Sequence, residues 1–414
     1  MPDVSRQAQS TAEPAPLWSV LAFVFLNSLG TGPVTNGIFF LAREAYGFSE
    51  GMSFALGIAL GVTFSSGAIA VGPALRALAH RLAWLTSRGV LATLMVMLGL
   101  VNAVPWFADY VGLGGPWTIW TLTMVYGALT GALWPITEAY LSGGRNGPLL
   151  RVATGRFNVV WSIAVVLSFW LMAPLVEDDP LGVLLALSGV HLVCIGLLAW
   201  HPREPAAHVE EIHEPHPKVY VSLLRSARFL HTSSYILLAA LNPLLAIVLD
   251  RSGLKVEWQT PLASTWMASR VIAFVVMERT KGWHGKRWVV PAGASLLGLG
   301  FTGCLVVPNL LSGTSQLVVL GISLALFGAG LGLVYSAAIY YAMSVGNAEV
   351  DAGGKHEALV GVGYTTGPML MLIGLWLTGA TGTSWAGEAL VISACLLLLC
   401  WASAMAFKRP PVYT

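Results

Sequence analysis

Charged side chains are scarce in this chain: Asp, Glu, Lys and Arg together make up 10% of its 414 residues. A soluble globular protein carries about 25%, so these charges could not cover a water-exposed surface, and lipid must solvate most of the chain. Hydrophobic residues reach 56%, and the mean hydropathy is +0.72. The composition therefore predicts an all-α polytopic membrane protein, and we do not expect an enzyme.

Several signatures of cofactor and metal chemistry are missing as well. The chain has no GxxxxGK[ST] loop and no sizeable soluble domain, which argues against direct use of ATP. Its cysteines are few, form no CxxC pair and all lie in apolar runs, which favours packing over disulfides or metal binding. We expect no cofactor, no bound metal and no nucleic-acid partner. The cysteines are Cys194, Cys304, Cys395 and Cys400.

Apolar runs long enough to cross a bilayer recur along the chain. A bilayer core of roughly 30 Å needs about 20 apolar residues per helix. Runs of that length predict twelve membrane-spanning helices. They cover approximately residues 17–42, 50–73, 88–107, 116–142, 153–175, 181–200, 229–249, 258–278, 288–307, 314–344, 356–379 and 384–407.

The basic residues orient these spans. If both termini are cytoplasmic, the inside segments and adjoining span ends hold 18 of the 22 Lys and Arg, and the outside loops hold three. The positive-inside rule therefore places both termini in the cytoplasm. We expect a disordered cytoplasmic tail at 1–16, a six-helix bundle at 17–200, a cytoplasmic linker with an interfacial segment at 201–228, a second six-helix bundle at 229–407 and a cytoplasmic tail at 408–414.

One stretch of the chain occurs twice in variant form. GALTGALWPITEAY at 127–140 returns as GAGLGLVYSAAIYY at 328–341, and the match resumes at 155–158 and 354–357. A weak internal duplication in an apolar chain is typical of secondary transporters. The two copies differ in their polar residues, and those mismatches are the first candidates for function.

Glycines spaced four apart predict close contacts between helices. Without a side chain they let two helix backbones approach each other. Such pairs occur at 57/61, 127/131, 328/332 and 363/367.

Twelve spans in two sets of six, with cytoplasmic termini and a cytoplasmic central linker, resemble the major facilitator superfamily. Its members typically carry a Gly-x-x-x-Asp-Arg-x-Gly-Arg signature between spans two and three. Here that loop reads GPALRALAHR at 72–81, without the acidic residue and the second glycine, and the corresponding loop at 278–287 reads ERTKGWHGKR. The resemblance implies two pseudo-symmetric six-helix bundles that alternate in access. It also implies cytoplasmic gate residues at Arg76, Arg81, Glu278 and Arg279.

The resemblance further implies that spans one, four, seven and ten line a central cavity. Polar and aromatic side chains gather on these spans, and Asn27 and Thr31, four residues apart, share one helix face. As a set they favour a cavity with aromatic walls for a polar or amphipathic solute, although each alone also fits simple packing. The candidate substrate-binding residues are Asn27, Thr31, Asn36, Trp134, Asn158, Trp161, Asn242, Trp266, Arg270, Tyr335 and Tyr341.

Arg270 is the one basic residue that the predicted topology places within a span. It lies about thirteen residues into the eighth run, too deep to reach either surface readily. An ionisable residue there costs about 2.5–3.5 kcal/mol and usually faces a cavity or a partner. Two hypotheses stay open: a cation that binds an anionic substrate group or a movable acid, and a structural arginine with a permanent partner.

Two glutamates near the duplicated segments are candidate proton carriers. Glu138 and Arg156 lie equally far from the turn between spans four and five, so a structural ion pair and a proton-carrying Glu138 both stay open. His356 and Glu357 open the eleventh run, where they could titrate near physiological pH. Helix capping by Glu357 at a wet interface is the alternative there.

These features predict a secondary active transporter that works by alternating access and moves a small polar, anionic or amphipathic organic solute, coupled to protons. Its partners would be that solute, H⁺ and the lipid bilayer. We expect a monomer in the inner cell membrane. Two alternatives stay open: a non-transporting membrane assembly or accessory protein with the same fold, and an exporter of lipids or other amphiphiles.

Overall fold

The structure, a computed structural model, describes residues 13–81, 86–207, 219–345, 350–381 and 386–407. Every regular element among these residues is helical, which confirms the predicted all-α class for the described part of the chain. The helices are α1 Leu17–Gly32, η2 Pro33–Gly37, α2 Ile38–Tyr46, α3 Glu50–Arg81, α4 Ser87–Tyr110, α5 Pro116–Ser142, α6 Gly147–Met172, α7 Pro180–Leu197, η3 Leu198–Trp200, α8 Val219–Arg251, α9 Val256–Ala263, α10 Thr265–Arg279, α11 Val289–Leu310, α12 Gly313–Val345, α13 Val350–Thr381 and α14 Ala386–Phe407.

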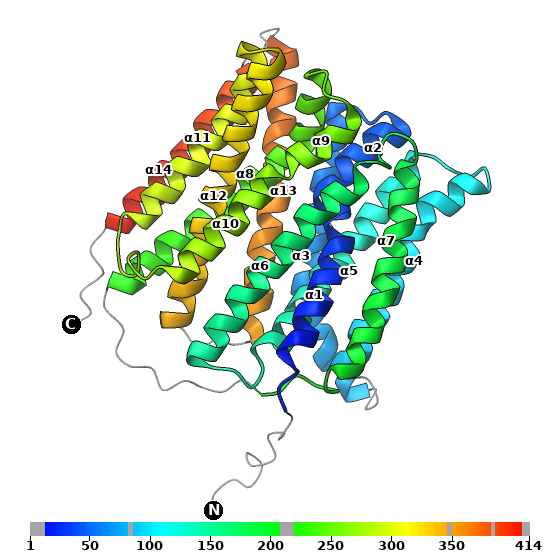
Figure 1. Ribbon diagram of the computed structural model, residues 1–414, viewed down its shortest axis with the longest axis vertical. Coiled ribbons are helices and arrows are strands. Elements are labelled where there is room, and N and C mark those ends of the chain that lie inside the picture. The colour runs from blue at the N-terminus through cyan, green and yellow to red at the C-terminus, as the bar shows by residue number, and fades with distance from the viewer. Residues whose placement is uncertain (1–12, 82–85, 208–218, 346–349, 382–385, 408–414) are drawn as a thin grey trace, which may run out of the picture.

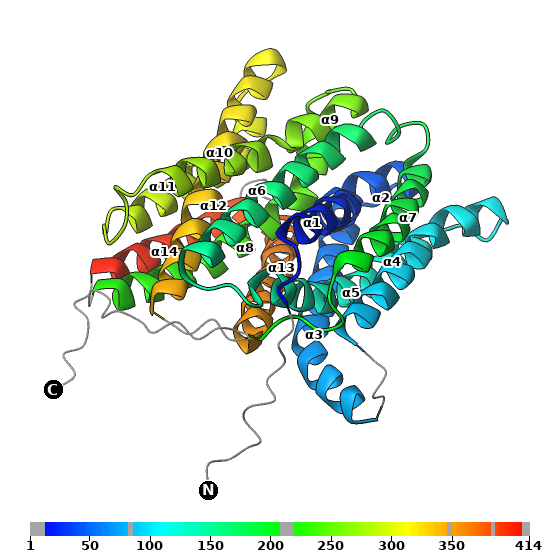
Figure 2. The same cartoon turned by 60° about the horizontal axis from the view of Figure 1, so that its bottom comes forward.

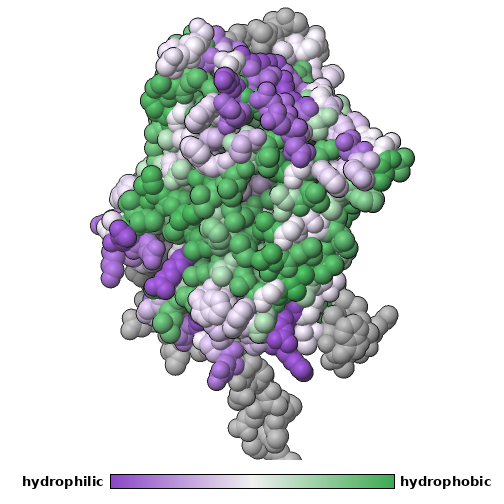
Figure 3. Space-filling view, turned by 45° about the vertical axis from the view of Figure 1, so that its right-hand side comes forward, coloured by the Kyte–Doolittle hydropathy of each residue, from purple (hydrophilic) through white to green (hydrophobic). Residues whose placement is uncertain are grey.

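Eleven stretches within the described residues are long and apolar enough to cross a membrane, and each overlaps one of the predicted runs. The last run corresponds to α14, a helix of 22 residues. Figure 3 shows a continuous hydrophobic band across the middle of one face, with hydrophilic residues above and below it. The chain is therefore a multi-pass membrane protein. Twelve spans in two bundles of six stays a prediction.

Two of the predicted spans are not continuous α-helices. The first changes from α1 to the π-helical turn η2 at Pro33, a residue that has no backbone N–H to continue the α-helical bonding pattern. The eighth divides at Ser264 into α9 and α10, three residues after Pro261. Both breaks lie beside the cavity described below, so they set the local direction of helices that form its wall.

The helices before residue 200 gather on one side of the molecule and most of those after residue 219 on the other (Figures 1 and 2). The two groups meet where α3 packs against α13 and where α6 packs against α10. These contacts join segments about 300 and 100 residues apart in the chain. The first, fourth, seventh and tenth predicted spans all contribute side chains to the cavity described below.

The paired glycines lie where helices approach each other closely. A Cβ atom added at Gly61 would lie 2.4 Å from the backbone N of Thr365 on α13. One added at Gly328 would lie 1.7 Å from the backbone O of Trp266 on α10. No side chain fits at such distances, which confirms the prediction of close helix contacts at these positions.

Several predicted segments fall partly outside the described residues. These are the N-terminal tail up to residue 12, residues 208–218 of the linker and the C-terminal tail from 408. The segment expected at the membrane interface is continuous with the seventh span, because α8 begins at Val219. A helix of 33 residues is longer than a bilayer core requires.

Candidate substrate-binding cavity

A cavity with about 730 Å³ of empty space, its open side included, lies between the two groups of helices. Its walls come from eight of the predicted spans, the first of which includes the π-helical turn, so it exists only in the folded molecule. The side chains that line it are Ser28, Thr31, Thr35, Asn36, Phe64, Trp134, Glu138, Phe157, Trp161, Val165, Tyr235, Leu238, Trp266, Met267, Arg270, Tyr335, Glu357, Val360 and Tyr364.

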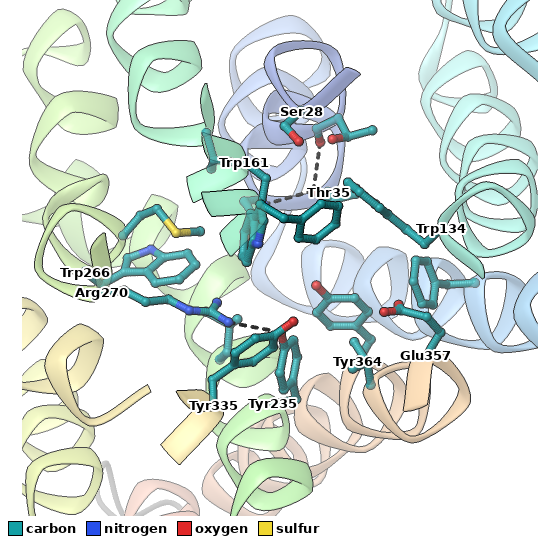
Figure 4. A pocket seen from close by; sticks show the side chains of 18 of the residues that line it. Ser28, Thr35, Trp134, Trp161, Tyr235, Trp266, Arg270, Tyr335, Glu357 and Tyr364 are labelled. Atoms are coloured by element: carbon teal, nitrogen blue, oxygen red, sulfur yellow. Dashed lines mark hydrogen bonds between the residues drawn. The ribbon is translucent and has the colours of Figure 1, made fainter. Parts of the chain in front are cut away.

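Arg270 projects from α10 into this cavity and is 1% exposed (Figure 4). Its guanidinium carbon lies 4.8 Å from the ring centre of Trp161 and 4.9 Å from that of Tyr335. The rings of Phe274 and Tyr235 follow at 5.2 and 5.9 Å. A cation within about 6 Å of an aromatic face is attracted by the ring, more strongly when water is excluded. The rings therefore hold the buried charge in place without neutralising it.

The hydrogen-bonding capacity of Arg270 is largely unused. One terminal nitrogen donates to the hydroxyl of Tyr235 over 3.3 Å, and Nε is buried with no partner. No carboxylate forms an ion pair with Arg270 in the part of the chain that the structure describes. A permanently paired structural arginine is thus not what these residues form. An arginine has five N–H donors in a planar fork suited to an anionic group, so the free donors point to an anionic partner.

Glu138 on α5 and Glu357 on α13 bring two carboxylates to the cavity from opposite groups of helices. Neither forms an ion pair within the described residues, and Arg156 is exposed rather than paired with Glu138. In Figure 4 the carboxylate of Glu357 lies on the far side of the cavity from Arg270, with tyrosine rings between them.

Aromatic rings form most of the remaining wall. Trp134 meets Phe157 edge to face at 6.1 Å, and Tyr364 meets both Phe64 at 5.5 Å and Tyr235 at 5.8 Å. Such pairs hold rings in fixed orientations because a ring's edge and face carry opposite partial charges. The result is a set of flat apolar surfaces placed between the cationic and the acidic side of the cavity.

The first span supplies the polar part of the wall, because the η2 turn carries Thr35 and Asn36. Thr35 donates to the backbone O of Thr31 over 2.7 Å, and the amide of Asn36 donates to Thr35 Oγ1 over 2.9 Å. Asn242 on α8 donates to Asn36 Oδ1 over 3.0 Å. Asn242 thus braces the wall from behind and joins the two groups of helices.

Nine of the predicted cavity residues line the cavity, counting substrate-binding and proton-coupling candidates together. They are Thr31, Asn36, Trp134, Glu138, Trp161, Trp266, Arg270, Tyr335 and Glu357.

Four other predicted residues lie elsewhere. Asn27 is buried and neither of its side-chain polar atoms has a partner. Asn158 accepts from Trp161 Nε1 at 3.4 Å, Asn242 supports Asn36, and the hydroxyl of Tyr341 accepts from the backbone N–H of Gly285 at 3.1 Å.

The predicted gate residues lie at the end of the molecule that the topology assigns to the cytoplasm. Arg76, Glu278 and Arg279 are exposed there. The carboxyl carbon of Glu278 would lie 3.1 Å from a Cβ atom added at Gly155, so this acid rests against α6. The side chains of Arg81 and His356 lie outside the described residues. The gate and proton-coupling roles stay predictions.

Sequence reasoning missed two ion pairs at the opposite end of the molecule. Arg43 on α2 pairs with Asp250 on α8 at 2.5 Å, and Glu50 at the start of α3 pairs with Arg251. Each pair joins the two groups of helices, and the polarity is reversed from one pair to the other. The only signal was the presence of Arg43 and Arg251 among the few basic residues predicted outside.

Sequence reasoning also missed the aromatic residues Phe64, Phe157, Tyr235 and Tyr364, which line the cavity. Nothing in their local sequence separates them from other aromatics of the apolar runs. Tyr235 could have been proposed from its place on the seventh span, because the family resemblance puts that span against the cavity.

No family model and no curated protein matches the sequence, but solved transporter structures match the fold. The nucleoside transporter NupG superposes with a TM-score of 0.66 at 13% identity, covering 95% of this chain and 99% of its own. The human organic anion transporter MFSD10 superposes with a TM-score of 0.62 at 15% identity, and the match covers 94% of this chain and 98% of MFSD10. An inward-facing bacterial homologue of the human lysosomal transporter Spinster superposes with a TM-score of 0.60 at 13% identity, and the match covers 94% of this chain and 95% of the homologue. At such identities the likeness shows the fold alone.

Proposed function

We propose that this chain, which has the fold of the major facilitator transporters, is a secondary active transporter of a small organic solute with an anionic group. The observation that carries the proposal is Arg270, a buried cation in an aromatic-walled cavity with free donors and no acidic partner among the described residues. An unneutralised charge inside a membrane protein is costly and usually belongs to a substrate or ion pathway. Coupling to protons through Glu138 or Glu357 is part of the proposal.

The proposed architecture has twelve spans in two six-helix halves, α1–α7 and α8–α14, with both termini in the cytoplasm of the inner membrane. Two observations support it. The helix α14 has the length that a twelfth span requires. The distribution of Lys and Arg favours cytoplasmic termini by 18 to three.

Alternating access would follow from rocking of the two halves about the cavity. The ion pairs Arg43–Asp250 and Glu50–Arg251 join the halves at the predicted outer end, which would hold that end closed while solute enters from the cytoplasmic side. Exposed ion pairs contribute only about 0.2–1 kcal/mol each. They are therefore weak enough to break and reform in every cycle.

The structural neighbours are compatible with this assignment. One is a nucleoside transporter and another an organic anion transporter, and both kinds of solute combine a flat or apolar body with polar groups. A cavity that places aromatic walls beside an arginine suits the organic anions better, because the guanidinium needs an anionic partner.

The decisive experiment compares two arginine variants in proteoliposomes that are screened with a library of organic anions. Arg270→Gln removes the cavity cation, and Arg225→Gln removes an exposed arginine of α8 as a matched control. We expect anion uptake in the wild type and in Arg225→Gln, and its loss in Arg270→Gln. Equal anion uptake by both variants would contradict the assigned role of Arg270.

Proton coupling is tested separately with Glu138→Gln, Glu357→Gln and the double variant. We expect the imposed pH gradient to stop driving uptake in the double variant. If a pH gradient still drives uptake there, the carrier assignment is wrong. If the wild type moves no solute and co-purifies with a stoichiometric protein partner, the accessory-protein alternative is the correct one.

A further inference from the structure

The cavity holds charges of both signs that do not neutralise each other directly. We infer that its solute is a planar monoanion that binds together with one proton, so that transport is electroneutral. This inference rests on the proposed transport function and adds the solute class and the coupling ratio. It is carried by three groups that line the cavity: Arg270, Glu138 and Glu357. Figure 4 shows Glu357 across the cavity from Arg270.

The solute class follows from Arg270 and the rings around it. The guanidinium offers a free Nε donor and further terminal donors to one anionic group. Trp161 and Tyr335 already lie within 5 Å of the guanidinium, at 4.8 and 4.9 Å. A carboxylate bound there would place the rest of the solute between Trp134, Trp266 and Tyr364, whose flat faces favour a ring or another planar body (Figure 4).

The coupling ratio follows from the two carboxylates. Glu138 and Glu357 line the same cavity, and no described cation forms an ion pair with either of them. Alternating access requires the cavity to close at some stage of the cycle, with and without solute. A closed cavity excludes bulk water, and a net charge left there is costly. Each closing state must therefore be close to neutral.

Neutrality determines how many protons each state holds. The empty cavity has one positive charge on Arg270 and is neutral when Glu138 and Glu357 carry one proton between them. A bound monoanion neutralises Arg270, so the remaining negative charge of the pair must be cancelled by a second proton on the other carboxylate. One proton thus enters with each anion, and it leaves when the anion is released.

Other titratable groups near the pair need to be considered. Tyr235, Tyr335 and Tyr364 face the cavity and are neutral at physiological pH as phenols. His231 on α8 is 3% exposed, with its ring 5.0 Å from that of Tyr235 and 5.1 Å from that of Tyr335. Lys355 and His356 precede Glu357, and their side chains lie outside the described residues. The variants below separate the glutamate pair from His231.

Four matched probes test the solute class: 3-phenylpropionate, phenylalanine, 3-phenylpropylamine and 3-phenylpropionamide. They share one ring and differ in carrying an anion, a zwitterion, a cation or no charge. Titration of the purified full-length protein should show binding of 3-phenylpropionate in preference to the other three. Preferential binding of phenylalanine or of the amine would overturn the monoanion assignment.

Calorimetry of 3-phenylpropionate binding in buffers of different ionisation enthalpy counts the protons taken up. We expect proton uptake to reach a maximum of one proton per ligand. In the pH range where that maximum holds, the affinity for 3-phenylpropionate should weaken about tenfold for each unit by which the pH rises. Binding with no proton uptake at any pH would overturn the coupling ratio.

The glutamate variants give a specific pattern. With one glutamine, the empty cavity is neutral without a proton, and anion binding still requires one, so Glu138→Gln and Glu357→Gln should each take up one proton. The double variant has no acid left and should take up none. His231→Gln serves as the control and should behave like the wild type. Loss of proton uptake in His231→Gln, or proton uptake that persists in the double variant, would contradict the assignment of the bound proton to Glu138 and Glu357.

A measurement on the wild type alone covers the case in which the double variant does not fold. Uptake of 3-phenylpropionate into proteoliposomes should respond to a pH gradient and not to a membrane potential set with valinomycin and K⁺. Uptake driven by the potential would overturn electroneutrality and leave the transport function standing. Absence of uptake for every organic anion in the library would instead contradict the proposed function itself.

Discussion

The contact between α10 and α12 sets the position of Arg270, and one methyl group should disturb it. Gly328 on α12 lies against the backbone of Trp266, which precedes Arg270 by one helical turn on α10. The change is Gly328→Ala. Gly321, seven residues earlier on the same helix, provides the matched control, because a Cβ atom there meets only Leu262 Cδ1, at 3.7 Å.

The size of the effect follows from the distances. The added Cβ atom at residue 328 would lie 1.7 Å from the Trp266 carbonyl oxygen, and real Cβ contacts essentially never fall below 3.0 Å, so the helices must separate by about 1.3 Å. Forcing a group into a packed interior costs about 1–3 kcal/mol. Replacing glycine by alanine in an open helix position instead stabilises by about 0.5–1 kcal/mol.

Transport should be impaired as well as folding. Arg270 moves with α10, and a displacement of about 1 Å in a positioning group can cost on the order of 10²-fold in rate. We therefore expect Gly328→Ala to be less stable in thermal unfolding than Gly321→Ala and to transport 3-phenylpropionate about 100-fold more slowly. Gly321→Ala should keep the wild-type rate and melt at the same or a slightly higher temperature.

Both variants are assayed in the same proteoliposome preparation, with the amount of inserted protein measured for each. Thermal unfolding in detergent, followed by tryptophan fluorescence, gives the stability comparison. If Gly328→Ala and Gly321→Ala melt alike and transport alike, α10 and α12 do not touch as described. The contact between α10 and α12 would then not set the position of Arg270.

Three further outcomes are expected. Asp250→Asn leaves Arg43 unpaired and should shift the equilibrium toward an outward-open state by up to about fivefold, which corresponds to one exposed ion pair. Labelling of an introduced cavity cysteine from outside measures this shift, and unchanged labelling would show that the Arg43–Asp250 pair does not hold the outer end closed. Asn242→Leu leaves the amide oxygen of Asn36 without its donor and should lower the free energy of unfolding by about 1–3 kcal/mol. A double-mutant cycle with Asn36→Leu should show coupling between the two residues, and additive losses of stability would contradict this hydrogen bond. Burial lowers the pKa of His201, just beyond the sixth span, below its ordinary value of 6.5, although its hydrogen bond with the backbone carbonyl of Leu197 acts in the opposite direction. The unfolded chain therefore binds more protons, and the stability should fall as the pH drops below about 6.5. A melting temperature of His201→Gln that falls equally with acid would refute this.

The membrane spans were predictable because insertion depends on composition over about 20 residues. The predicted runs and the helical stretches agree to within a few residues at most ends, as at 116–142 and 50–73. Larger differences occur where a helix continues beyond the hydrocarbon core. The run at 229–249 is part of a helix that begins at Val219, and hydropathy cannot detect an extension into water.

Arg270, Glu138 and Glu357 were predictable for a related reason. A charge within a membrane span is costly, so the few that occur stand out against an apolar background. Tyr235, Tyr364 and Phe157 were not predictable, because lipid and the protein interior are about equally apolar. A span therefore carries no clear apolar stripe, and its sequence does not reveal which aromatic side chains face the cavity.

By itself, the sequence determined that the chain crosses the membrane many times and which few polar residues had to be explained, and its basic residues predict an orientation. It also located the close helix contacts, because only glycine leaves room for them. Only the tertiary structure decided that Arg270 has no acidic partner among the described residues, that Glu138 and Glu357 line one cavity, and that Arg43 and Glu50 find partners on α8. The two ion pairs join residues 207 and 201 positions apart in the chain, and the surroundings of Arg270 also come from other helices, so no local pattern encodes these contacts.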